Sequence, residues 1–574
     1  MGGQGSAGAS GGLWELALGF SASCTNILVM FTLVPVVLIT SLSSGLGVAA
    51  ISPTVALQYA TFQGVNDGNL TKFLGVPFAQ PALRFELPKP PTLLHGVQNA
   101  TAFGAACPQQ ALSPLSVPFT PPNYSAISED CLTLNVFKPS PADSHSKLPV
   151  FVWIYGGGFE LGNSADTDVR PVVERSIATG EPVIVVTPNY RVSAFGFLGG
   201  KEAGSAGITN LGLRDQIFAL QWVQQHIAAF GGDPNRVVIG GPSAGAISTG
   251  MLLLSNDQHS SALFRGAFML SGSPISTGSV ADGQPYYDEL VTANNCIGSR
   301  DTLDCLKRVP FDSFMATVNN TINLFSYSSI ANIWRPRVDG DVIVQDPLIS
   351  VSEGLYAKIP IMTGDSDDEG TLFSFSNTNV TTNAEFLAYV QSNYLPTSTP
   401  SQIEKIGVLY PDDPTQGSPF DTGSANQLTP EFKRLAAFQG DFTFTGVRRF
   451  FLEHASTRQD AWSWVNKRGK LTPILGSSHG SDLGIWFPTN TTENIGVDAL
   501  VNFINTLDPN RSAARGNSSH PSVFWPKWKV PSSSGRSSLL TFSDPEGVNI
   551  TAENFRVDAI KFLNNLLFEA ALTK

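Results

Sequence analysis

One serine in this sequence has the surroundings of a catalytic nucleophile. Ser243 is central in GPSAG (241–245), and the longer stretch RVVIGGPSAGAISTGMLLLS (236–255) reads as a short apolar strand, a glycine-rich turn and a helix. In a nucleophile elbow, the two glycines of G-x-S-x-G let neighbouring backbone segments pass closely. The pattern also surrounds Ser10 and Ser478, but no strand precedes the first and SDLGIWF, after the second, predicts no helix. The sequence therefore predicts Ser243 as the nucleophile.

Three consecutive glycines upstream are suited to stabilising negative charge. LPVFVWIYGGGFELGN reads as a buried strand, Val150 to Tyr155, that opens into residues 156–158. Backbone without Cβ atoms can aim its N–H groups at a developing oxyanion. The alternative is a plain glycine turn, but three adjacent glycines cost considerable conformational entropy on folding. We predict an oxyanion hole formed by the N–H groups of Gly157, Gly158 and Ala244.

A serine hydroxyl needs a base to take its proton, and the base needs an acid to fix its tautomer. Of seven histidines, His479 lies in a Gly/Ser loop late in the chain, where an elbow hydrolase places its base. The alternative is an ordinary surface histidine. For the acid, IPIMTGDSDDEGTLF places four carboxylates on one loop after an apolar strand: Asp365, Asp367, Asp368 and Glu369. The residues alone do not choose among them, and a solvated loop or a calcium site is the alternative.

Length and composition indicate one large enzyme-sized folding unit. The chain has 574 residues, with no internal repeat and no long Pro/Gly/Ser linker after residue 60, so we expect a single domain over residues 51–574. Its 35 basic and 47 acidic residues give a net charge of −12, which argues against nucleic acid and anionic membrane surfaces and favours a neutral or cationic partner. The 42% of apolar residues, with 37 phenylalanines, suffice for a large core and an apolar binding cavity. We expect no metal or cofactor.

The N-terminal region predicts export. The first 71 residues contain no Lys or Arg, and an apolar run begins at Asn26. If translation starts at Met30, residues 30–50 have a short n-region, an apolar h-region and a cleavage site at Val48-x-Ala50. We therefore expect residues 1–50 to be a cleaved leader and the mature chain to have no stable membrane insertion. A retained membrane anchor and a core helix are the alternatives.

Cysteine usage also fits a secreted protein. Cys24 falls in the expected leader, and an even set remains: Cys107, Cys131, Cys296 and Cys305. Three pairings are possible, and sequential pairing is favoured because it closes the shortest loops. Each such bridge contributes roughly 2 to 3 kcal/mol to stability. Four buried free thiols are the alternative, and nine N-x-S/T sequons are consistent with a glycoprotein.

Several longer segments resemble the type-B carboxylesterase/lipase family, more closely its secreted fungal esterases and lipases than the cholinesterases. They are SEDCLTLNVFKP (128–139), WIYGGGFELGN (153–163), NYRVSAFGFL (189–198), the stretch from NLGLRDQ to GGPSAGA (210–246), DDEGT (367–371) and SSHGSDL (477–483). The resemblance spans most of the chain after about residue 54. It implies an α/β-hydrolase fold, with a large, mostly parallel central sheet flanked by helices.

The resemblance also assigns the remaining site residues. The acid is then Glu369, in the family's DEGT-like motif, and the chain order Ser243, Glu369, His479 is the one expected of this fold. Ser271, in MLSGSP, matches a family serine that supports the acid, and the family's two disulfides match the sequential pairing. One departure is Pro242, which stands where the family usually has a glutamate, so that buried carboxylate is absent here.

Together these features predict a secreted serine carboxylic-ester hydrolase that acts on apolar esters through an acyl-enzyme intermediate. The alternatives are a non-catalytic adhesion module on the same fold, a peptidase, and, among esterases, an interfacially activated triacylglycerol lipase or a sterol esterase. In lipases of this kind the loop closed by the first disulfide carries a helical lid. Here five prolines among its 23 residues predict an extended loop and little interfacial activation. Residues 372–388 are the alternative lid.

Overall fold

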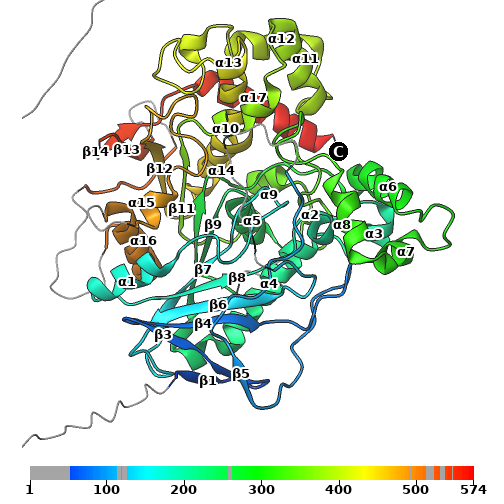
Figure 1. The fold of residues 1–574 in the computed structure, drawn as a ribbon. Helices are drawn as coiled ribbons and strands as arrows, with labels where there is room; N and C mark the ends of the chain where they lie inside the picture. Colours follow the sequence, from blue (N-terminus) through cyan, green and yellow to red (C-terminus); the bar gives the residue numbers. More distant parts are fainter. Residues whose placement is uncertain are drawn as a thin grey trace, which may run out of the picture. The chain divides into compact units, whose positions relative to one another are not determined.

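An 11-stranded sheet lies at the centre of the described chain (Figure 1). Its order is β14 (Gly547–Ala552), β13 (Ser538–Ser543), β12 (Ala461–Lys467), β11 (Ile361–Ser366), β10 (Gly266–Leu270), β9 (Gly232–Pro242), β7 (Leu148–Trp153), β8 (Ile184–Pro188), β6 (Thr133–Pro139), β4 (Leu70–Pro77) and β3 (Val65–Asp67). The seven strands from β13 to β8 pair in parallel, and the strands at both edges pair antiparallel. A second, three-stranded sheet contains β1 (Thr54–Ala56), β2 (Thr61–Gln63) and β5 (Val97–Asn99).

The computed structural model describes residues 52–573 apart from 113–117, 119–123, 125, 256–261, 490–493, 512–522, 531–536 and 546. The predicted leader, residues 1–50 with Met30, lies outside the described residues. So do residues 113–117, 119–123 and 125 of the proline-rich loop predicted to be extended. In the part that is described, no helix is both long and apolar enough to cross a bilayer.

The central strands are buried on both faces, which explains their continuous apolar sequence. In β7, Val150 and Val152 belong to one hydrophobic cluster, while Phe151 and Trp153 belong to another. Successive strand residues point to opposite faces, so the two clusters lie on opposite sides of the sheet. The strand predicted from Val150 to Tyr155 is thus present, displaced by two residues at each end.

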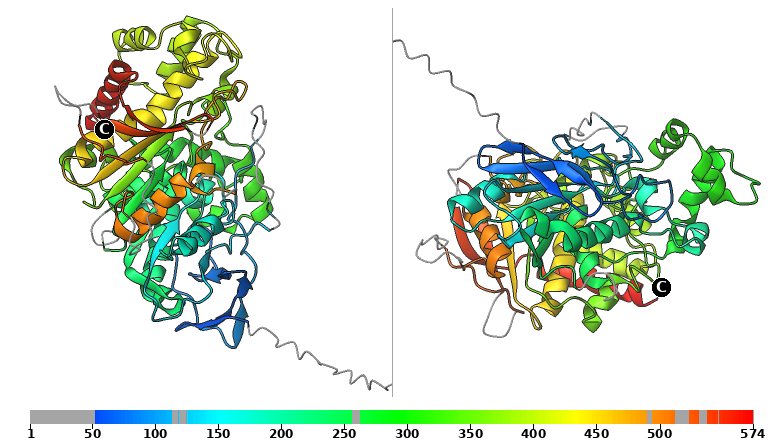
Figure 2. Two further views of the ribbon diagram at one scale, coloured as in Figure 1. Left: turned by 90° about the vertical axis from the view of Figure 1, so that its left-hand side faces the viewer. Right: turned by 90° about the horizontal axis from the view of Figure 1, so that it is seen from below.

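Helices cover both faces (Figures 1 and 2). One face is covered by α1 (Arg170–Ala178), α15 (Leu483–Trp486) and α16 (Ile495–Thr506). The other is covered by α4 (Leu211–His226), α5 (Ala244–Leu254), α9 (Pro347–Glu353), α14 (Gly446–Ala455) and α17 (Val557–Leu572). The predicted mostly parallel sheet flanked by helices is confirmed.

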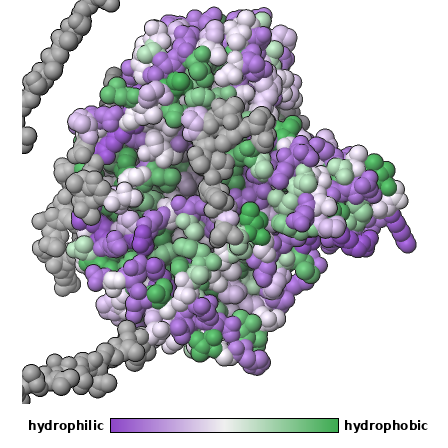
Figure 3. Space-filling model, viewed as in Figure 1, coloured by the Kyte–Doolittle hydropathy of each residue, from purple (hydrophilic) through white to green (hydrophobic). Residues whose placement is uncertain are grey.

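Further helices belong to the long connections between strands. Those before β11 are α2 (Ser193–Phe197), α3 (Lys201–Ser205), α6 (Gln284–Ala293), α7 (Thr302–Arg308) and α8 (Phe311–Asn319). Those between β11 and α14 are α10 (Thr371–Ser374), α11 (Asn383–Asn393), α12 (Pro400–Leu409) and α13 (Phe432–Gly440), followed by a π-helical turn, Asp441–Thr445. On the described surface of the face in Figure 3, hydrophilic and hydrophobic residues are interspersed.

Both disulfides form as predicted. Cys107 pairs with Cys131 at a Cα–Cα distance of 5.0 Å, and Cys296 pairs with Cys305 at 5.8 Å. The alternative of four free thiols is therefore wrong. The first bridge joins the segment just before β6 to the segment that follows β5, and the second closes the loop between α6 and α7.

The sheet brings all the predicted site segments to one edge. Strands β7, β9, β10, β11 and β12 are neighbours and run parallel, so their carboxyl ends lie together. These ends are followed by the glycine loop, Ser243, Ser271, Glu369 and the loop of His479. In open α/β sheets this edge is where ligands bind.

Candidate active site

Ser243 occupies a strained turn between β9 and α5. Its φ of 54° and ψ of −124° are rare for a residue with a side chain, and such strain is found at functional sites. Its N–H donates to the Leu270 carbonyl at 2.8 Å, which fixes the turn against β10. A Cβ atom on Gly241 or Gly245 would lie 2.2 or 2.1 Å from the Ile154 carbonyl oxygen. Both glycines of the motif are therefore required by the close approach of β7's end.

Pro242 takes the last position of β9, opposite Leu270 of β10. Proline fixes its own φ and has no N–H to donate. Because β9 ends at this residue, the missing N–H removes no hydrogen bond from the rest of the strand. The backbone thus tolerates the departure from the family pattern. No carboxylate stands at this position to interact with the nucleophile.

The glycine loop lies against the nucleophile. A Cβ atom on Gly156 would lie 3.1 Å from the Ser243 Cβ. Gly157 and Gly158 have φ values of +105° and +63°, which side chains rarely adopt. Among the described residues, no acceptor bonds to the N–H groups of Gly157, Gly158 or Ala244. These groups remain available to a ligand oxygen.

His479 contacts one carboxylate, that of Glu369. The imidazole Nδ1 lies 2.5 Å from Glu369 Oε2. The other oxygen, Oε1, accepts hydrogen bonds from the Ser271 hydroxyl and from the Ser366 N–H, each at 2.6 Å. Glu369 is only 2% exposed, so these three partners hold it in one orientation. With Nδ1 facing the carboxylate, Nε2 is the nitrogen left to face a substrate or nucleophile.

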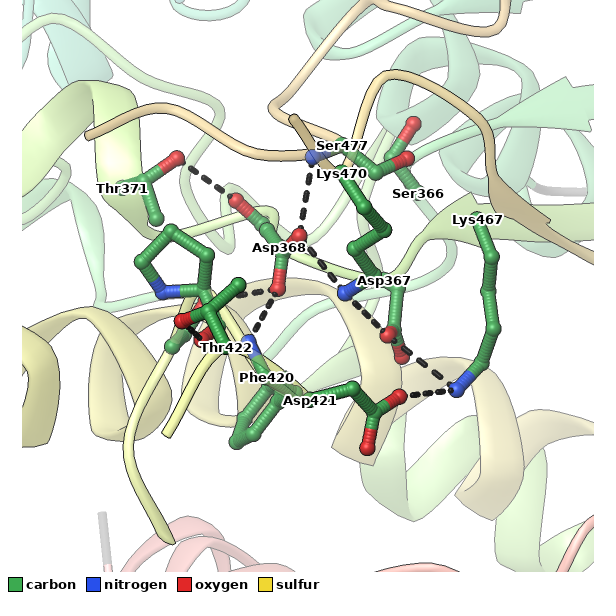
Figure 4. Close-up of polar contacts among 12 residues, drawn as sticks. Ser366, Asp367, Asp368, Thr371, Phe420, Asp421, Thr422, Lys467, Lys470 and Ser477 are labelled. Carbon is green, nitrogen blue, oxygen red and sulfur yellow. Dashed lines mark hydrogen bonds and ion pairs between the residues drawn. The ribbon is translucent and has the colours of Figure 1, made fainter. Parts of the chain in front are cut away.

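The other three acids of this loop belong to buried ion pairs. Asp365 pairs with Arg448 at 2.6 Å, and Lys470 Nζ lies 2.5 Å from Asp367 and 2.7 Å from Asp368. Figure 4 shows the Lys470 ammonium between Asp367 and Asp368. The alternative of a solvated loop is wrong, because all four carboxylates are buried. In the described part of the chain, no group of three or more His, Cys, Asp and Glu residues could hold a metal ion.

Burial changes the acidity of carboxyl groups near His479. Burial raises the pKa of Asp365 to about 6, against the opposing effect of Arg448. Burial and the nearby Glu369 charge raise the pKa of Asp482 to about 7. Asp482 accepts a hydrogen bond from Trp464 Nε1 at 3.2 Å. Sequence reasoning missed Asp482, although it follows His479 by three residues in SSHGSDL.

A cavity of about 50 Å³ opens beside Ser243. The His479 ring packs against Phe373 and Phe444, with ring centroids 5.1 and 4.7 Å apart, and both phenylalanines line this cavity. The two aromatic rings therefore place His479 and Ser243 beside the same space. Other apolar lining residues are Phe159, Ile247, Ile275, Leu324 and Ile330. Phe373 comes from the stretch 372–388 named above as an alternative lid, and its side chain is a buried wall residue.

The two other serines of the G-x-S-x-G pattern do not share this setting. Ser10 lies outside the described residues. Ser478 lies in the loop after β12 and forms a β-bridge with Asp368. The expectation that no helix follows it is wrong, since α15 begins at Leu483, but α15 has only four residues.

Comparison with known proteins identifies the family. A model of the carboxylesterase family matches residues 51–540. The chain is 37% identical over 544 residues to a secreted triacylglycerol lipase, LIP1, of Gibberella zeae, with 90% of each chain covered. It is also 37% identical over 547 residues to lipase 2 of Diutina rugosa, covering 91% of this chain and 97% of that one.

A solved structure shows the same fold. The crystal structure of Aspergillus niger EstA superposes with a TM-score of 0.75 at 27% identity, covering 90% of this chain and 98% of that one. Together with the mostly parallel 11-stranded sheet flanked by helices, this match confirms the predicted α/β-hydrolase architecture. The chain belongs to the carboxylesterase family and is, as the sequence predicted, a secreted carboxylic-ester hydrolase.

Proposed function

We propose that the enzyme hydrolyses apolar carboxylic esters through an acyl-enzyme formed on Ser243. The observation that carries the proposal is the 2.5 Å contact between Glu369 and His479, at the same sheet edge as the strained Ser243 turn. A nucleophile, a base and an acid that orients the base are the parts that serine hydrolysis requires. The carboxylate fixes the imidazole tautomer and stabilises the imidazolium when it forms.

The first half of the reaction acylates the serine. The Ser243 oxygen attacks the ester carbonyl while His479 takes the hydroxyl proton. The oxyanion that forms accepts hydrogen bonds from the N–H groups of Gly157, Gly158 and Ala244, and removal of one such donor typically costs about 3 to 4 kcal/mol of transition-state stabilisation. The tetrahedral intermediate then collapses, the bond to the alcohol oxygen breaks, and His479 gives its proton to the leaving alcohol.

The second half repeats these steps with water. His479 takes a proton from water as the water oxygen attacks the acyl carbon, and the same N–H groups stabilise the second oxyanion. The bond to the Ser243 oxygen then breaks, and His479 returns the proton to that oxygen. The products are a carboxylic acid and the free enzyme.

The apolar lining of the cavity favours apolar acyl groups. Triacylglycerols are a second candidate substrate, because a relative with 37% identity is named a triacylglycerol lipase. Sterol esters remain a further alternative within the same chemistry. A non-catalytic adhesion module fits less well, because the chain carries Ser243 together with a His479 that contacts Glu369 at 2.5 Å. A peptidase remains a weaker alternative.

A fluorophosphonate probe tests the mechanism. We expect stoichiometric labelling of the peptide that contains Ser243, with parallel loss of activity on p-nitrophenyl esters, and no labelling after Ser243→Ala. A chain-length series of p-nitrophenyl esters then defines the acyl preference. Labelling of a different serine, or hydrolysis without any labelling, would contradict the proposal.

A further inference from the structure

Two arginines close together in the chain have no carboxylate partner among the described residues: Arg335, which lines the cavity beside Ser243, and Arg337, which lines a neighbouring cavity. Arg335 forms neither an ion pair nor a hydrogen bond with them. Arg337 is 5% exposed, and its Nη2 donates to the Ile333 carbonyl at 3.0 Å, while its buried Nε has no acceptor. Arg337 is buried and Arg335 is partly buried. A cation removed from water without a counter-ion is costly, so this pair needs an explanation.

Several other arginines of the chain have carboxylate partners. Arg191 binds Asp215 at 2.7 Å, Arg434 binds Glu431 at 3.1 Å, and Arg556 binds Asp441 at 2.8 Å. Arg265 has no carboxylate partner either, but its guanidinium donates to the carbonyls of Ile504 and Asn505. Arg335 differs from all of these because its guanidinium has no acceptor among the described residues, so it is free to bind a group that arrives with a ligand.

Arg335 stands where two cavities meet. It lines the small cavity beside Ser243 and also a larger one of about 400 Å³. The residues shared by both linings are Ile275, Ile330, Asn332, Arg335 and Thr443. A substrate whose ester group lies at Ser243 can therefore extend past Arg335.

Neighbouring carboxylates already have partners of their own. Asp282 also lines the larger cavity, and its side chain accepts from the Ser279 N–H at 2.7 Å. Asp346 accepts from the Ser276 hydroxyl at 2.7 Å and the Leu348 N–H at 2.9 Å. The charges of Asp282 and Asp346 raise the pKa of Arg335, but burial has the larger effect and lowers it.

The larger cavity also contains the Asp282 carboxylate, but among the described residues that line the cavity beside Ser243, Arg335 is the charged one. Burial and the adjacent Arg335 lower the pKa of Arg337 to about 10, as expected where two cations share one region. A local field in a cavity is set by its nearest groups, so a chain with net charge −12 can still present a positive site. This differs from the preference for neutral or cationic partners that the overall charge suggested.

We infer that Arg335 binds a carboxylate carried by the ester substrate, and that the preferred substrates are therefore esters with an acyl or alcohol part that ends in an anionic group. The inference rests on the proposed serine esterase function. A guanidinium can bind a carboxylate through two parallel N–H···O bonds, which are strong where water is excluded. The apolar lining nearer Ser243 then holds the hydrocarbon between the ester and the anion.

Matched pairs of esters test this inference. On the acyl side, mono-p-nitrophenyl adipate is compared with p-nitrophenyl hexanoate, which has the same chain length and a methyl end. On the alcohol side, the butyrate ester of 6-hydroxyhexanoic acid is compared with hexyl butyrate. The measured quantity is the ratio of kcat/KM for the carboxylate ester to kcat/KM for its neutral match.

We expect Arg335→Leu to lower this ratio about 10- to 100-fold in one of the two pairs, as the loss of a hydrogen-bonded charge pair implies. Arg335→Lys keeps the charge without the paired geometry and should lower it less. The matched control is Arg170→Leu, which removes an exposed arginine paired with Asp168. That control should leave the ratio unchanged. If Arg335→Leu does not fold, Arg335→Lys carries the comparison.

An unchanged ratio in both ester pairs for the folded Arg335 variants overturns the inference. A proposed function that is itself wrong gives a different result. In that case the wild-type enzyme would hydrolyse neutral esters without labelling of Ser243, or would not hydrolyse them at all. Active enzyme is counted by fluorophosphonate titration in every variant, so loss of folded protein is not mistaken for loss of recognition.

Discussion

The Glu369 carboxylate and the His479 imidazole lie 2.5 Å apart, although 110 positions separate them in the chain. Among the described residues, Glu369 is the acid that contacts this ring, while its neighbours Asp367 and Asp368 pair with Lys470. Four carboxylates on one loop thus divide into one that faces the site and three that hold the fold together.

Replacing the nucleophile or the base should abolish most activity. Ser243→Ala or His479→Ala should lower kcat by roughly 10⁴- to 10⁶-fold, because the members of a triad act as a unit. Folding should be near normal by circular dichroism. Ser478→Ala is the matched control, and a large loss of kcat there with an active Ser243→Ala would show that the nucleophile is Ser478.

Replacing the acid should separate catalysis from stability. Glu369→Gln should lower kcat by roughly 10³- to 10⁴-fold, since an amide neither holds the correct tautomer nor stabilises the imidazolium. Asp368→Asn should instead lower the free energy of unfolding by about 1 to 3 kcal/mol, because Lys470 keeps Asp367 as a partner. Urea unfolding and kinetics on both variants check this. A dispensable Glu369 with an essential Asp368 would refute the assignment.

Ser271 should act as a positioning residue. Ser271→Ala removes one of the three contacts that orient Glu369, and we expect kcat to fall about tenfold with KM nearly unchanged. The hydroxyl bonds Glu369 and is not among the residues that line the Ser243 cavity. If the variant changes only the melting temperature and leaves kcat intact, Ser271 has a structural role alone.

Glu160 should make stability depend on pH. Burial raises its pKa to about 8, its Oε2 accepts from the Leu324 N–H at 2.6 Å, and its buried Oε1 has no partner in the described structure. The folded state therefore holds a proton that the unfolded chain releases above its ordinary pKa of 4.5. The contribution of Glu160 to the free energy of unfolding is therefore fully present below its ordinary pKa of 4.5 and is lost as pH rises toward 8.

The variant Glu160→Gln keeps an acceptor for the Leu324 N–H and cannot ionise. We expect its free energy of unfolding to fall less than that of the wild type between pH 5 and pH 8. Guanidinium unfolding of both proteins across this range gives the comparison. Parallel pH dependences in the two proteins would mean that Glu160 does not stay protonated in the folded state.

Interfacial activation should be weak. Five prolines between Cys107 and Cys131 oppose a helical lid there, so dissolved esters should reach the site directly. We expect the rate to follow substrate concentration smoothly through the solubility limit of a short triacylglycerol. A sharp rise in rate as an emulsion forms would show that a functional lid exists, with residues 372–388 the next segment to examine.

The sequence by itself determined the features that depend on residues close to one another in the chain. Gly241 and Gly245 are required because neighbouring backbone passes within about 2 Å of where a Cβ would stand, and such a requirement is visible as a short motif. The glycine loop after β7 and the apolar strands are equally local, since composition and periodicity over a few residues specify them. Sequential pairing of four cysteines followed from their spacing.

Tertiary structure decided every relationship between distant segments. The residues alone left Asp365, Asp367, Asp368 and Glu369 open, and only the family resemblance pointed to Glu369. The contact itself depends on the parallel pairing of β11 with β12, which sets the loop of His479 against Glu369 and Lys470 against Asp367 and Asp368. Residue type cannot show this, because all four acids have the same chemistry until burial and neighbours distinguish them. The cavity wall formed by Phe373 and Phe444, and the unpaired Arg335 behind it, come from connections whose packing only the folded chain defines.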